Sequence, residues 1–83
     1  MHEYGIARDI VRQAAAQAKG CGAGRITALR LRVGPGAAVD LEALIFGIQA
    51  AASGTVAEGA VVELAEAPGS GIILVSLEVE EAA

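Results

Sequence analysis

Two segments of the chain repeat apolar residues at intervals of three and four, which is the period of one face of an α-helix. These segments are residues 2–19 and 41–53. A glycine-rich stop at residues 20–24 ends the first helix, and Asp40 precedes the second as an N-cap or first-turn acid. The apolar stripes consist of Ile6, Ile10, Val11, Ala14, Ala15 and Ala18 in the first helix, and of Leu41, Leu44, Ile45, Ile48, Ala51 and Ala52 in the second.

Three other segments alternate apolar and polar residues, which predicts β-strands with one solvated face. They are residues 25–33, 60–67 and 72–80, and turns at residues 34–36 and 68–71 end the first strand and separate the last two. The expected core-facing residues are Leu29, Leu31 and Val33, then Val62 and Leu64, then Ile73, Val75, Leu77 and Val79.

The predicted order of elements is therefore α-β-α-β-β. Because each strand has a single apolar face, both helices should cover one face of a three-stranded mixed sheet, giving a two-layer α+β sandwich. The first two strands, connected through the second helix, should be parallel with a right-handed crossover. The short turn should pair the last two strands antiparallel. The open face should hold exposed ion pairs that fix register more than they add stability, namely Arg30 and Arg32 with Glu63, Glu78 or Glu80.

Composition narrows the class of protein. Residues 1–83 are enough for a single domain, and with 54% apolar but only 2% aromatic residues its core must be aliphatic. The formal charge of −4 argues against nucleic acid as a partner, because phosphates call for a basic patch. The sequence has neither an apolar run of membrane-spanning length nor the regions of a signal peptide, so we expect a cytoplasmic protein without a membrane partner.

The sequence offers no arrangement of residues for catalysis. With one histidine and one cysteine, nothing can form a nucleophile, its base and an orienting group, so we expect that the chain is not an enzyme. Cys21 cannot form an internal disulfide, and we interpret it as a spare thiol in the glycine-rich stop.

Met1, His2 and Glu3 form the one candidate site with a defined chemistry. The α-amine of Met1, the backbone nitrogen of His2 and the imidazole of His2 can reach one ion through fused chelate rings. Glu3 adds a carboxylate or its own backbone nitrogen at a fourth position. Nitrogen-rich planar donor sets suit Ni(II) or Cu(II). Because His2 is too bulky for ready removal of Met1, we expect the amine to stay where the chelate needs it.

Residues 1–7, Met-His-Glu-Tyr-Gly-Ile-Ala, closely resemble the start of the HypA nickel-insertion proteins, which mature nickel–iron hydrogenases. The opening motif is specific because it works only at a terminus. The resemblance covers nearly the whole chain in order, continuing through residues 25–27, 29–34, 41–44 with Phe46, 54–55, 57–60 and 76–80.

The resemblance implies a Ni(II)-binding metallochaperone domain that delivers nickel toward the hydrogenase large subunit, in company with the GTPase HypB. The family's nickel motif is matched here by Met1, His2 and Glu3. Asp40 falls where some members carry an acid after the first strand, so the resemblance implies a further ligand there; a helix cap is an equally open interpretation of the same residue. Oligomeric state is not indicated.

The chain also departs from the family pattern. HypA proteins carry a zinc domain with two C-x-x-C pairs between the second and third strands of this layout, where this chain has only the short turn at residues 68–71. We therefore expect no zinc, and either an engineered deletion or a naturally reduced member would explain the change. Residues 34–38 also replace a more polar turn. The alternative function is a structural or protein-interaction module that retains partner docking without metal transfer.

Overall fold

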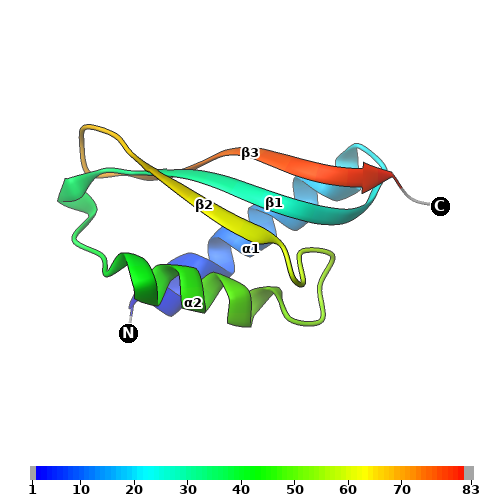
Figure 1. Cartoon of the computed structure of the whole chain (residues 1–83), viewed down its shortest axis with the longest axis horizontal. Helices are drawn as coiled ribbons and strands as arrows, with labels where there is room; N and C mark the ends of the chain where they lie inside the picture. The colour runs from blue at the N-terminus through cyan, green and yellow to red at the C-terminus, as the bar shows by residue number, and fades with distance from the viewer. Residues whose placement is uncertain (1, 82–83) are drawn as a thin grey trace.

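The computed structural model describes residues 2–81, except for the side chain of His2. Its elements are α1 (His2–Gly20), β1 (Ala23–Val33), the 3-10 helix η1 (Pro35–Ala37), α2 (Leu41–Ala52), β2 (Val61–Glu66) and β3 (Ile72–Glu81). Both helices lie on one side of a three-stranded sheet (Figure 1). The predicted α-β-α-β-β order and the two-layer α+β sandwich are therefore confirmed, with element boundaries within one or two residues of the prediction.

The order of strands in the sheet is β2-β1-β3, with β1 in the centre. The predicted parallel pairing of β1 with β2 is confirmed. The predicted antiparallel pairing of the last two strands is wrong, because β3 pairs antiparallel with β1 and lies on the opposite edge from β2. The linker from β2 to β3 is short, yet it passes across the end of β1 instead of forming a hairpin (Figure 1).

Backbone hydrogen bonds hold this linker against the turn that follows β1. The N–H of Gly34 donates to the carbonyl of Gly71 at 2.9 Å, and the N–H of Gly36 donates to the carbonyl of Gly69 at 3.0 Å. A Cβ atom at Gly34 would collide with the carbonyl oxygen of Gly69. The two glycine-rich segments therefore approach each other so closely that a side chain at position 34 does not fit.

The core lies between the helices and the sheet and is aliphatic, as the composition predicted. Among the described residues no polar or charged residue is buried. The buried residues of the core cluster are Ala7, Ile10, Val11, Ala14, Ala18, Ile26, Leu29, Leu31, Val33, Leu44, Ile48, Ala52, Ala57 and Ala60.

The predicted inner face of β3 is partly wrong. Arg30 pairs with Ser76 while the next residue of β1, Leu31, pairs with Leu74, so Val75 is an extra residue in a β-bulge. The bulge reverses the alternation on its N-terminal side. As a result Leu74 packs on the core, as do Ile72 and the correctly predicted Leu77. Ile73 and Val75 are therefore wrongly assigned to the core, and they are 60% and 48% exposed. Val79 lies after the bulge and pairs with Ile26, but it is 41% exposed and does not belong to the core cluster either.

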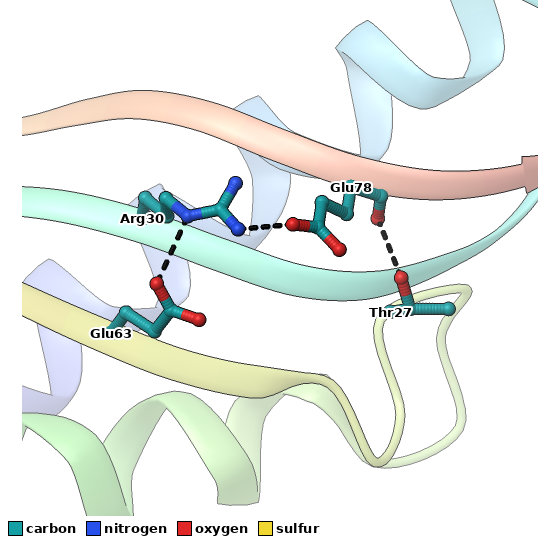
Figure 2. Close-up of polar contacts among 4 residues, drawn as sticks. All are labelled: Thr27, Arg30, Glu63 and Glu78. Atoms are coloured by element: carbon teal, nitrogen blue, oxygen red, sulfur yellow. Dashed lines mark hydrogen bonds and ion pairs between the residues drawn. The ribbon is translucent and has the colours of Figure 1, made fainter.

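An arginine in the central strand links all three strands on the open face of the sheet (Figure 2). The Nε of Arg30 donates to Glu63 on β2 at 2.9 Å, and its Nη2 donates to Glu78 on β3. Hydrogen bonds to Glu78 and then Glu63, together with the attraction of both carboxylates, raise the pKa of Arg30. The predicted pairing of Arg30 with Glu63 and Glu78 is confirmed, whereas Arg32 forms no ion pair among the described side chains.

Candidate metal centre

Helix α1 begins at His2, inside the Met-His-Glu motif. The first N–H groups of an α-helix have no carbonyl partner within the helix. A backbone nitrogen of this turn can therefore bind a metal ion without the loss of a helical hydrogen bond. The nitrogen-rich donor set that the motif offers fits Ni(II), for which square-planar nitrogen coordination is favourable.

The predicted ligands are placed by the structure to different extents. Met1 lies outside the described residues, and of His2 only the backbone is described, at the start of α1. Glu3 lies in the first turn and is half-buried. Asp40 is exposed and caps α2, because its Oδ1 accepts a hydrogen bond from the backbone N–H of Ala43 at 3.1 Å. The helix-cap interpretation of Asp40 is thus confirmed, and its role as a ligand stays a prediction.

The first turn of α1 lies directly against α2. A Cβ atom built on Gly47 of α2 would be 3.7 Å from the Cα of Tyr4 and 3.8 Å from the carbonyl oxygen of Glu3. The two helices start at the same end of the molecule (Figure 1), and further along them Val11 and Ala51 line one shallow pocket. Tracing both helices back from Gly47 therefore leads to the terminus on α1 and to Asp40 on α2.

Asp40 precedes α2 at the end of the molecule where α1 also begins (Figure 1). It precedes Gly47 by seven residues, which corresponds to about 10 Å of helical rise. Glu3 and Asp40 are brought to the same end of the molecule.

Gly47 is the residue at this site that the sequence analysis missed. A glycine inside a helix is less stable than alanine by roughly 0.5–1 kcal/mol, and this one is buried. A buried glycine in the middle of an apolar stripe indicates that another backbone approaches closely. That signal was present in the sequence, between Phe46 and Ile48.

The rest of the described chain offers no competing metal site. Among residues whose side chains are described, no three His, Cys, Asp or Glu residues are grouped closely enough to hold a metal ion. Cys21 is exposed, and its thiol donates to the carbonyl of Ala18 at 3.4 Å. In the described part of the chain, neither helix combines the length and the apolar character needed to cross a membrane.

The structure thus defines a small α+β domain whose candidate metal motif includes the first turn of a helix. The family model described as "Hydrogenase/urease nickel incorporation, metallochaperone, hypA" matches residues 1–72. The chain belongs to this HypA family. Membership in a metallochaperone family confirms the prediction that it is not an enzyme.

Individual relatives support the same family. The hydrogenase maturation factor HypA of Azotobacter vinelandii is 44% identical over 69 residues, which are 83% of this chain and 61% of that protein. The factor of the same name from Chlorobium limicola is 47% identical over 66 residues, which are 80% of this chain and 57% of that protein. The chain thus spans less than two thirds of the length of these relatives.

A solved structure gives an independent comparison of the fold. The solution structure of the Ni metallochaperone HypA from Helicobacter pylori matches with a TM-score of 0.82 at 15% sequence identity. The match covers 99% of this chain and 100% of that chain. At this level of identity it shows that the two proteins share a fold.

Proposed function

We propose that this chain is the nickel-binding domain of a HypA-type metallochaperone, and that it binds Ni(II) through Met1, His2 and Glu3. The observation that carries the proposal is the position of this motif: it lies inside the region that matches the family model, at the first turn of a helix. Asp40 is proposed as a further ligand, because its carboxylate lies at the same end of the molecule.

The proposed donors explain both binding and release. The amine of Met1, the backbone nitrogen of His2 and the imidazole of His2 form fused chelate rings, and Glu3 or Asp40 completes the coordination. Of the proposed donors whose side chains are described, neither Glu3 nor Asp40 belongs to the buried core cluster. The ligands can therefore leave the ion one at a time without unfolding the domain, which a delivery protein needs.

The proposed destination of the metal follows from the relatives. They are named hydrogenase maturation factors. We propose that this chain delivers nickel toward the large subunit of a hydrogenase and that a HypB-type GTPase takes part. The family description also names urease, and a second destination is compatible with the same site.

We further propose that residues 1–83 act as a single nickel-binding domain without structural zinc. The family's zinc domain would fall between β2 and β3, which are separated here by residues 67–71. The chain contains one cysteine and one histidine, too few for a closed tetrahedral zinc site. Because β2 and β3 lie on opposite edges of the sheet, the short linker has to cross β1 instead of closing a hairpin.

Titration of the untagged protein with Ni(II), beside the variant His2→Ala, tests the proposed site. The variant should fold normally and lose tight nickel binding, because the imidazole is a ligand. Gln17→Ala is a suitable control, since Gln17 is exposed on the same helix far from the terminus. Circular dichroism checks the fold. Unchanged nickel affinity in well-folded His2→Ala protein would exclude the terminal site.

The alternative is a structural or protein-interaction module, which would retain docking without metal transfer. The same titration separates the two functions. An untagged, folded protein that binds nickel no more tightly than its His2→Ala variant would favour the interaction module.

A further inference from the structure

Gly47 lacks a side chain for a reason other than backbone conformation. It lies in the middle of α2, and its φ is not among the positive values that only glycine adopts readily. Its position instead faces the first two turns of α1. A Cβ atom there would be 3.2 Å from the Cβ of Ala7, which is closer than side chains normally pack.

The contact partner of Gly47 cannot move aside easily. Ala7 is fully buried and belongs to the core cluster. Close-packed interiors transmit a local displacement instead of absorbing it. A side chain at position 47 would therefore push the first turn of α1, with the backbone of Glu3 and Tyr4, away from α2.

We propose that Gly47 is a positioning residue for the terminal nickel site. By allowing the helices to touch, it fixes the first turn of α1, which carries the proposed ligand Glu3, against α2. This inference rests on the proposed function, because it concerns the same site. Outer residues that hold metal ligands in place typically alter metal affinity by about ten- to a hundredfold when they are changed.

The chain offers a matched control for the loss of a helical glycine. Gly5 lies near the start of α1, next to Tyr4, whose backbone faces Gly47. A Cβ atom built on Gly5 would meet nothing within 4 Å. Gly5→Ala and Gly47→Ala therefore both replace a helical glycine with alanine. Only Gly47→Ala inserts an atom between the two helices.

The test measures the Kd for Ni(II) by competition with a chromophoric chelator, together with the visible circular dichroism of the bound ion. Gly47→Ala should raise the Kd by about tenfold and alter the spectrum, and Gly47→Leu should raise it further. Gly5→Ala should match the wild type. The double variant Gly47→Ala with Ala7→Gly should regain the wild-type Kd and spectrum, because it removes the opposing Cβ.

The rescue separates positioning from stability. Ala7→Gly weakens helix α1 and removes a buried methyl group, so a merely structural role for Gly47 predicts no recovery of nickel binding. A folded Gly47→Ala protein whose Kd and spectrum equal those of Gly5→Ala would overturn the proposal. If Gly47→Leu fails to fold, Gly47→Ala alone decides the question. If His2→Ala also leaves wild-type binding unchanged, the terminal site itself is wrong; if only the Gly47 effects are missing, the positioning role is wrong.

Discussion

The carboxylate of Asp40 has one observed role, as a helix cap, and one proposed role, as a metal ligand, and the two can be measured separately. It accepts a hydrogen bond from the backbone N–H of Ala43, and it lies at the same end of the molecule as the nickel motif. The sequence could predict the cap, because an aspartate before an apolar helical stripe is a local signal. Whether the carboxylate also reaches the metal depends on how α1 and α2 pack, which no local pattern contains.

Replacing Asp40 should separate capping from metal binding. Asp40→Ala should lower the free energy of unfolding by about 1 kcal/mol, because an N-cap hydrogen bond is lost. Asp40→Asn should preserve stability, since asparagine caps as well as aspartate, but it should weaken nickel binding because the anionic oxygen is gone. Urea unfolding and Ni(II) titration measure the two effects. Nickel affinity that is equal in the wild type and Asp40→Asn would leave Asp40 as a cap alone.

A residue added before Met1 should abolish tight nickel binding. The addition converts the primary amine to an amide and places it inside the chain, so the proposed set of fused chelate rings is lost. The same short extension at the C-terminal end provides the control, because it leaves the amine unchanged. Tight square-planar nickel binding by the N-terminally extended protein would show that the terminus does not anchor the ion.

At the scale of helices and strands, the sequence predicts what depends on local periodicity and fails where contacts are distant. Both helices and all three strands could be found from their apolar spacing. The residues of β3 that face the core could not be predicted, because residues 72–75 are all apolar and alternation alone cannot decide which of them point inward. The bulge at Val75 makes that choice through pairing with β1.

The placement of β3 depends on a contact between two turns, and this contact can be tested. Gly34→Ala puts a Cβ atom against the carbonyl of Gly69, so it should displace the linker and lower the free energy of unfolding by about 1–3 kcal/mol. Gly20→Ala is the control, because a Cβ atom at Gly20 would meet nothing within 4 Å. Urea unfolding measures both. Equal stability of the two variants would mean that the linker yields without cost.

At the scale of the whole molecule, the parts that maintain the fold are separate from the part proposed to bind metal. The aliphatic core lies between the helices and the sheet, and the Arg30 ion pairs lie on the open face (Figure 2). The nickel motif lies at the end of the molecule where both helices begin (Figure 1). If the ion binds at the proposed site, we therefore expect the domain to gain or lose it while its core and its sheet stay unchanged.

This separation predicts that acid should release nickel before it unfolds the protein. Free imidazole has a pKa near roughly 6.5 and an α-amine near roughly 8, and a coordinating amide must lose its proton. Protons therefore compete with Ni(II), so binding should release protons and the affinity should fall steeply between about pH 7.5 and 6. Calorimetric titration in buffers of different ionisation enthalpy measures the proton release.

The ion pairs of Arg30 should be unaffected when the pH falls from about 7.5 to about 6. The direction of the pKa shift of Arg30 gives the reason. The pKa of Arg30 is raised in the folded state by its hydrogen bonds to Glu78 and Glu63. The stability that arises from a raised pKa is fully present below the unfolded-state pKa and is lost only as the pH rises through the folded-state value. Both values for arginine lie far above neutrality, so urea unfolding of the metal-free protein at about pH 6 and at about pH 7.5 should show no loss of stability that comes from Arg30. Nickel affinity that persisted to about pH 5.5 would require coordination dominated by carboxylates, and would move the site from Met1 and His2 toward Glu3 and Asp40.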